Sequence, residues 1–288
     1  MIKCAAAVDI GTVTCRLLIA QIKDGQIIPQ KRGLAFTQLG RGRDEAGNIS
    51  AAAEQRLADA LRSFKAEIAD LPCYCFATSA MRTAPNGARI AQDMPLPVHI
   101  IDGQTEAALS FAGTLSGFSL DQAEKALVID VGGGSTEFAF GTSSGLIKTK
   151  SHPVGARVIV DKFADPQGAL PLLRDEFRVF CKDCEPDRVF AVAGTATSVV
   201  AVRKRLSPYD PEQVHGTGLR LSDLFETYAM LSALSLPERR QVPGLEPERA
   251  EVILGGLITL IAALQASGKD QLTVSETDIL QGALQRYR

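Results

Sequence analysis

One pattern of residues occurs twice in this chain of 288 residues, with its two copies 121 positions apart. Each copy has an apolar run that ends in an aspartate, then a glycine turn, a second apolar run and a hairpin tip. The corresponding residues are Asp9 and Asp130, Gly11 and Gly132, Arg16 and Glu137, and Asp24 and Gly145. Four features in the same order at the same spacing indicate a duplicated β-hairpin unit. The chain is therefore limited to folds with two equivalent halves.

A second correspondence follows the hairpins in each half. The apolar run 73–77 is followed by Thr-Ser-Ala, and the apolar run 189–193 is followed by Gly-Thr-Ala-Thr. Both segments are typical of a buried strand that turns into a helix. With the helices expected between them, each half has the order β-β-β-α-β-α.

Helices are expected between the strands of the first half. Ser50 can cap a helix that extends to about residue 69, and the apolar residues of this segment recur at helical spacing. Thr105 is a candidate cap for a second helix that ends near residue 115. We predict an α/β fold with two lobes, residues 1–118 and 119–288, whose glycine turns face each other across a cleft. The last helix is expected to pack back on the first lobe.

The segment 126–140 holds the turn that more strongly indicates a phosphate site. Three consecutive glycines are followed there by two hydroxyl residues. Glycines let backbone N–H groups crowd around an anion, and the hydroxyls add donors. Taken alone, the segment also fits an ordinary hairpin turn with a capping aspartate. The equivalent turn in the first half favours a phosphate held between the two. The candidate phosphate-binding residues of the turns are Gly11, Thr12, Thr14, Gly132, Gly133, Gly134, Ser135 and Thr136.

Charged residues accompany both turns. Arg16 begins the strand after the first turn and can hold a phosphate bidentately. Glu137 occupies the equivalent position after the second turn, so a positive and a negative group are expected across the cleft. Asp130 and Glu137, with Asp9 as a further ligand, are candidates to hold Mg²⁺ mostly through water. Arg82 follows a strand-to-helix turn, where free N–H groups favour anions, although a surface ion pair also explains an arginine there.

The composition excludes several kinds of partner. The net charge of −2 gives no global positive field for nucleic acid or a membrane surface. The longest apolar run, 252–264, is too short to span a bilayer, and Asp9 interrupts the N-terminal apolar run too early for a signal peptide. Cys181 and Cys184 have the spacing of half a zinc site without a second half, so reduced structural thiols are expected. We expect a cytoplasmic protein that binds neither nucleic acid nor membrane.

In several of its motifs the chain resembles the exopolyphosphatase and guanosine pentaphosphate phosphohydrolase (Ppx/GppA) family, which belongs to the actin and hexokinase superfamily. The most specific matches are the Gly-Gly-Gly-Ser-Thr-Glu segment and the Ser-Ala-Met-Arg segment. The matching segments are 8–11, 76–82, 101–107 and 129–137, with weaker matches at 193–197, 214–216 and 249–251. The resemblance therefore covers almost the whole chain.

The resemblance implies a duplicated ribonuclease-H-like fold with an interdomain cleft, and hydrolysis of a terminal phosphoanhydride with Mg²⁺ (or Mn²⁺). It implies that Glu106 is the catalytic base, whereas the residue pattern alone also fits a solvated carboxylate in the first turn of a helix. Glu137 is then expected to position metal and water for catalysis. The chain is expected to be a short, two-lobed homodimeric member without the C-terminal HD-type domain of long members.

Some positions depart from the family pattern. Val13 replaces an amide side chain in the first turn, Gln38 stands where an arginine is common, and Thr105 stands where a second glutamate is frequent. Gln281 is a further departure, in the last motif. These changes remove polar or basic contacts to a ligand.

Several functions fit this sequence. The first is an exopolyphosphatase that releases orthophosphate from inorganic polyphosphate, with guanosine pentaphosphate as an alternative substrate. The second, motivated by the departures in the first turn and at Gln38, is a non-catalytic module that binds polyphosphate or guanosine tetraphosphate. A sugar kinase or an actin-like ATPase is less well supported, because Glu137 follows the second turn and no sugar-contact segment is recognisable.

Overall fold

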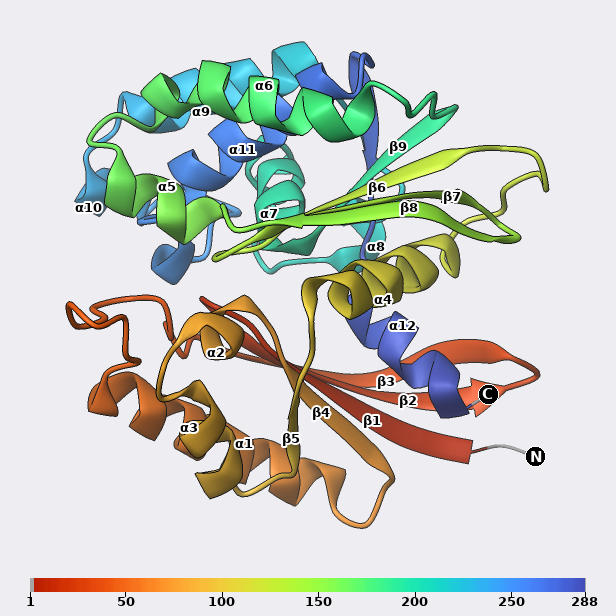
Figure 1. Ribbon diagram of the computed structural model, residues 1–288, viewed down its shortest axis with the longest axis vertical. Coiled ribbons are helices and arrows are strands. Elements are labelled where there is room, and N and C mark those ends of the chain that lie inside the picture. The colour runs from red at the N-terminus through yellow and green to blue at the C-terminus, as the bar shows by residue number, and fades with distance from the viewer. Residues whose placement is uncertain (1–2, 288) are drawn as a thin grey trace.

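The computed structural model describes residues 3–287, which form two β-sheets with a pair of helices between them (Figure 1). The first sheet contains five strands, and only the pairs β1–β2 and β2–β3 are antiparallel. In spatial order these strands are β3 (Gln26–Ala35), β2 (Cys15–Lys23), β1 (Lys3–Ile10), β4 (Cys73–Ala77) and β5 (Val98–Ile100).

The second sheet repeats this arrangement and adds one edge strand. In spatial order its strands are β10 (Gly218–Arg220), β11 (Gln271–Val274), β9 (Arg188–Val192), β6 (Ala126–Val131), β7 (Thr136–Thr142) and β8 (Gly145–His152). β6, β7 and β8 form an antiparallel meander, whereas β9 pairs in parallel with both β6 and β11. The order β8-β7-β6-β9-β11 therefore matches β3-β2-β1-β4-β5. This match confirms the duplicated ribonuclease-H-like fold.

One face of the first sheet is covered by three helices, α1 (Ala51–Ile68), α2 (Ser79–Thr83) and α3 (Gly87–Asp93). As predicted, Ser50 caps α1, because its hydroxyl accepts a hydrogen bond from the Ala53 amide. The apolar stripe of α1 packs with the inward side chains of β1 and β2 in one buried cluster; the stripe consists of Leu57, Leu61, Phe64 and Ile68.

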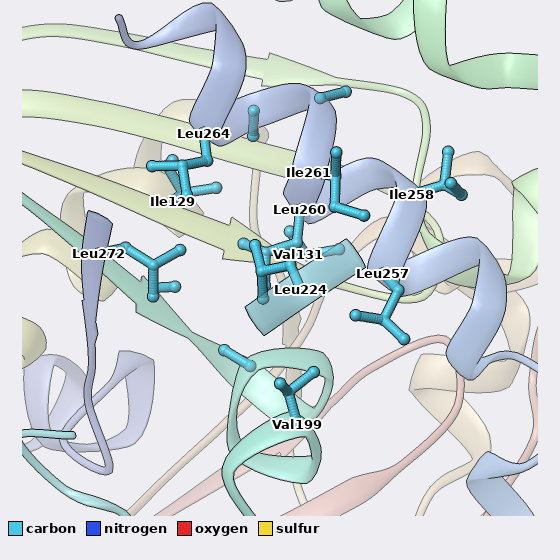
Figure 2. Close-up of a cluster of buried hydrophobic side chains, with 14 of the residues drawn as sticks. Ile129, Val131, Val199, Leu224, Leu257, Ile258, Leu260, Ile261, Leu264 and Leu272 are labelled. Atoms are coloured by element: carbon cyan, nitrogen blue, oxygen red, sulfur yellow. The ribbon is translucent and has the colours of Figure 1, made fainter. Parts of the chain in front are cut away.

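The corresponding face of the second sheet carries the larger core. Its central helix, α11 (Ile253–Ala266), is buried on all sides, and its side chains pack on Ile129 and Val131 of β6 (Figure 2). Within residues 3–287, none of the helices has the length and hydropathy needed to cross a membrane. The remaining helical elements on this side are α5 (Ala156–Lys162), η1 (Pro166–Ala169), α6 (Leu170–Cys181), α7 (Ala193–Lys204), α8 (Pro211–Val214), α9 (Leu221–Ser232), α10 (Leu236–Arg239) and η2 (Pro247–Arg249).

Two helices lie between the sheets, α4 (Gly103–Leu115) and α12 (Ile279–Leu284), the latter followed by η3 (Gln285–Tyr287) (Figure 1). Each packs on the sheet of the other half. Ala107 and Phe111 of α4 contact the second sheet, whereas the apolar residues of α12 pack on β1 and β2. The two helices touch where Gly113 faces the Asp278 carbonyl and Gly282 faces the Leu109 carbonyl.

The prediction that Thr105 caps α4 is wrong. The cap is Asp102, which has an extended backbone and accepts a hydrogen bond from the Thr105 amide at 2.7 Å. A short carboxylate at this position satisfies a free N–H of the first turn. The helix therefore begins at Gly103, and Glu106 lies in its first turn.

Candidate active site

The two hairpin turns have the same internal hydrogen bond and touch each other. The Gly11 amide donates to the Thr14 carbonyl at 2.9 Å, and the Gly132 amide donates to the Ser135 carbonyl at 3.0 Å. A Cβ added to Gly133 would lie 2.7 Å from Cγ2 of Val13, so the approach of the two turns requires glycine there. The duplicated pattern in the sequence therefore produces two turns that face each other.

A cavity of about 90 Å³ lies between the turns. It brings together most of the predicted site residues, from both halves of the chain. Those on its wall are Asp9, Gly11, Thr12, Thr14, Arg16, Glu106, Asp130, Gly132, Gly133, Gly134 and Ser135. Arg82, Thr136 and Glu137 are not part of that wall.

The backbone of the second turn is arranged to leave donors available. The carbonyls of Gly132 and Gly133 accept from the amides of Ala156 and Arg157 at the start of α5. Within residues 3–287, the amides of Gly133 and Gly134 donate to no protein acceptor. Such free N–H groups beside a cavity suit an anion. The hydroxyl of Thr136, in contrast, donates to the Val154 carbonyl at 2.7 Å and is fully buried.

Glu106 is the carboxylate whose surroundings suit proton transfer best. Only 7% of it is exposed, and burial, opposed by the charge of Arg82, raises its pKa to about 7. Nη1 of Arg82 donates to the Glu106 carboxylate at 2.8 Å and to the Ile101 carbonyl at 2.9 Å. The structure thus places Arg82 against the predicted base, where it fixes the orientation of that carboxylate.

A pair of carboxylates lies next to Glu106. Asp130 and Glu137 are directly paired residues of β6 and β7. Burial raises the pKa of Asp130 to about 6, and burial together with the charges of Glu106 and Asp130 raises the pKa of Glu137 well above its ordinary value. Hydroxyls hold both, since Ser110 donates to Asp130 and Ser151 donates to Glu137.

These carboxylates fit a cation that is bound mainly by water and phosphate oxygens. Three acidic groups packed together repel one another, and a bound cation would relieve that repulsion. In the part of the chain that the structure describes, however, no three His, Cys, Asp or Glu side chains converge as a ready ligand set. Mg²⁺ commonly binds through one or two carboxylates and keeps several waters, so this donor set is compatible with it.

Arg16 has two carboxylate partners. It donates to Oδ2 of Asp9 through Nε at 3.1 Å and through Nη2 at 2.6 Å, and its Nη1 donates to Asp278. Asp9 is its directly paired residue on β1, whereas Asp278 caps α12. The predicted phosphate-binding arginine therefore lines the cavity as part of an ion-pair cluster, and Asp9 is engaged with it.

Sequence reasoning missed several residues of the site. Ser79 and Thr195 line the cavity from the starts of α2 and α7. The second correspondence between the halves pointed to both segments and could have identified them. Arg249 also lines the cavity and lies against Gly194, with its Nε bonded to Glu246 at 2.6 Å. The weak family match at 249–251 included Arg249, but the sequence did not indicate where its side chain lies.

Two ribonuclease-H-like halves with facing glycine turns define the actin and hexokinase class of fold. Residues 18–286 match the Ppx/GppA phosphatase family, and the chain belongs to this family. Membership in a phosphatase family makes the chain a hydrolase. The family resemblance drawn from the sequence motifs is thereby confirmed.

Known relatives are similar along nearly the whole chain. A bifunctional 3-dehydroquinate synthase/phosphatase of Fusobacterium nucleatum is 32% identical over 97% of this chain, which spans only 46% of that protein. Exopolyphosphatase 2 of Mycobacterium tuberculosis is 29% identical, with 96% of both chains covered. The crystal structure of the Aquifex aeolicus Ppx/GppA family member has a TM-score of 0.81 at 27% identity, and the match covers 100% of this chain and 98% of that one.

Proposed function

We propose that this chain hydrolyses the terminal phosphoanhydride of inorganic polyphosphate and releases orthophosphate. The observation that carries the proposal is the position of Glu106, a buried carboxylate with a pKa of about 7 on the wall of a cavity between two glycine turns. A general base works best when its pKa is near the operating pH. The similarity to an exopolyphosphatase over 96% of both chains supports the same substrate.

In this mechanism the terminal phosphoryl group is held by the free amides of Gly133 and Gly134. A water molecule between that group and Glu106 attacks phosphorus, and the carboxylate takes its proton. The new bond joins the water oxygen to phosphorus, the anhydride P–O bond breaks, and the shortened chain leaves with the bridging oxygen. Arg82 holds Glu106 in place, so the base is oriented before the substrate arrives.

The proposal includes Mg²⁺ (or Mn²⁺) as cofactor. Asp130 and Glu137 would hold the ion through oxygen ligands and water. Asp9 is the weaker candidate, because it already accepts two hydrogen bonds from Arg16. A divalent cation neutralises the charge on the phosphoryl oxygens when it is bound. The homodimer expected from the resemblance stays a prediction.

Guanosine pentaphosphate is a second candidate substrate, and one observation favours it. A cavity of about 210 Å³ adjoins the first and shares Arg16, Gly194 and Arg249 with it. Tyr209 and Thr197 also line this second cavity. It provides room for an organic group beyond the phosphates.

The proposal is tested by measuring orthophosphate release from tripolyphosphate, from a long polyphosphate and from guanosine pentaphosphate, each with Mg²⁺ and with EDTA. We expect Mg²⁺-dependent release from the two inorganic substrates. Release from guanosine pentaphosphate alone would select the second candidate. Binding of all three substrates without release from any would contradict the hydrolytic proposal and favour the binding module.

A further inference from the structure

We propose that Asp278 determines substrate specificity, because it competes with the substrate for Arg16 and thereby favours substrates of low charge over long polyanions. The inference rests on the proposed function in one respect, namely that the cavity between the turns binds phosphate. Asp278 lies at the start of α12, 262 positions from Arg16 in the sequence. Asp278 lines the cavity of about 210 Å³. Arg16 lines both that cavity and the one between the glycine turns.

The Asp278 carboxylate is held in place from its own helix. Its Oδ1 accepts a hydrogen bond from the Leu280 amide at 3.0 Å, and its backbone amide donates to Oε1 of Gln281 at 3.0 Å. Only 6% of Asp278 is exposed. Because this reciprocal cap fixes the carboxylate, an incoming phosphate must compete with it for Arg16, and displacing it would disturb the first turn of α12.

Asp278 and Asp9 together accept hydrogen bonds from most of the N–H donors of Arg16. Three of the five N–H groups of the guanidinium donate to these two carboxylates. The cluster sets two carboxyl groups against a single guanidinium, so it has no excess of positive charge. Arg16 therefore presents two remaining N–H donors to a phosphate but no net positive charge.

The second cavity has no excess of positive charge either. Its three arginines are matched by three carboxylates; these six residues are Arg16, Arg32, Arg249, Glu246, Glu276 and Asp278. Each additional phosphoryl group brings more negative charge into such a site, without a matching cation on the protein. The charge balance therefore suits a short phosphoanhydride, and removal of one carboxylate would shift the preference toward longer chains.

The test is the substitution Asp278→Asn, because asparagine keeps the helix cap and removes the charge. We expect KM to fall about threefold for pyrophosphate and about tenfold for a long polyphosphate, with kcat changed less than about twofold. Adding Arg16→Gln to this variant should abolish the gain. A KM that is unchanged, or that falls equally for every chain length, would overturn the inference.

Glu276→Gln is the matched control. Glu276 lines the same cavity, but its partners are Arg32 at 3.7 Å and the Tyr209 hydroxyl. We expect a smaller shift in KM than for Asp278→Asn, because Arg16 stays neutralised. An equal shift in KM in both variants would show that only the overall charge of the cavity matters. That result would overturn the role assigned to Asp278.

Calorimetric titration with tripolyphosphate separates this inference from the proposed hydrolysis. It is done in a Glu106→Gln background, where turnover is blocked. Tighter binding after Asp278→Asn supports the inference even if the unmodified chain releases no phosphate, in which case only the hydrolytic proposal fails. Unchanged affinity in an otherwise active enzyme contradicts the inference alone.

Discussion

Arg16 and Glu137 occupy equivalent positions in the two hairpins. Arg16 pairs with Asp9 across β1 and β2, and Glu137 pairs with Asp130 across β6 and β7, in the same register. The duplication thus places an arginine and a carboxylate in one half and two carboxylates in the other. This asymmetry gives the second half the paired carboxylates that the proposed metal ion would use as oxygen ligands. Glu106 reaches the same region from α4, which lies between the sheets (Figure 1).

Substitution of Arg82 should move the pH profile upward. The charge of Arg82 lowers the pKa of Glu106 against the larger effect of burial, so Arg82→Gln should raise that pKa from about 7. The base is then protonated up to a higher pH, and the acidic limb of kcat/KM should shift upward by about one unit. Arg89→Gln, which breaks the ion pair between an exposed arginine and Glu54, is the control and should leave the acidic limb in place. A limb that moves to lower pH in Arg82→Gln would contradict this role.

Asp130→Asn should stabilise the fold at neutral pH. Burial raises the pKa of Asp130 from its ordinary 3.8 to about 6, so between these values the folded state binds more protons than the unfolded state. The carboxylate therefore destabilises the fold increasingly from about pH 4 to pH 6, and the cost is fully present above pH 6. Asparagine removes this cost and can still accept the hydrogen bond from Ser110.

Urea unfolding of Asp130→Asn and the unmodified chain at pH 4.5 and pH 7.5 measures this effect. The gain in the free energy of unfolding should be about 3 kcal/mol at pH 7.5 and only about 1 kcal/mol at pH 4.5. A loss of stability at pH 7.5, or a gain that does not depend on pH, would show that the Asp130 charge is not the cause.

Removal of divalent cations should abolish phosphate release, and Mg²⁺ should restore it. Asp130→Asn should raise the Mg²⁺ concentration needed for half-maximal release by roughly tenfold or more, because it removes one of the few carboxylate ligands. Titration of Mg²⁺ into chelator-treated protein gives the half-maximal Mg²⁺ concentration for the unmodified chain and for the variant. Full release in the presence of EDTA would rule out the metal role of Asp130 and Glu137.

The contact between α4 and α12 should tolerate no side chain. A Cβ on Gly113 would collide with the backbone carbonyl of Asp278, and neither helix backbone can yield locally. Gly113→Ala should therefore cost more than about 2 kcal/mol of stability and lower phosphate release, since the two helices carry Glu106 and Asp278. Gly168→Ala is the matched control, because its added Cβ would meet only the Phe163 ring at 4.0 Å. Equal stability of the two variants, measured by urea unfolding, would contradict this account.

Much of the fold was predictable because its signals are local and repeated. The alternating apolar runs, the two-residue turn at Asp24 and Gly25, and the Ser50 cap are short-range features, and the structure shows each of them. The cap of α4 was mispredicted because Asp102 and Thr105 both suit that position. The choice depends on where β5 ends, which the sequence does not mark.

The site was predictable only where the duplication reveals it. Both turns and the equivalent residues Asp9 and Asp130 lie on the cavity wall, because these positions meet between equivalent halves. The pairing of Arg16 with Asp278 was not predictable, because these residues are 262 positions apart and meet only when α12 returns to the first sheet. Similarly, no local pattern shows that Arg82 contacts Glu106 or that the Thr136 hydroxyl is bonded to a buried carbonyl.

The most direct test of the central claim is the rate of orthophosphate release from polyphosphate by Glu106→Gln, compared with the unmodified chain. Glutamine can still accept the hydrogen bond from Arg82, so the fold and the Asp278→Asn binding response should survive. Glu54→Gln, which removes a partly exposed carboxylate paired with Arg89, provides the control. We expect kcat to fall about 10²- to 10⁴-fold for Glu106→Gln alone. A kcat within about twofold of the unmodified chain would contradict it.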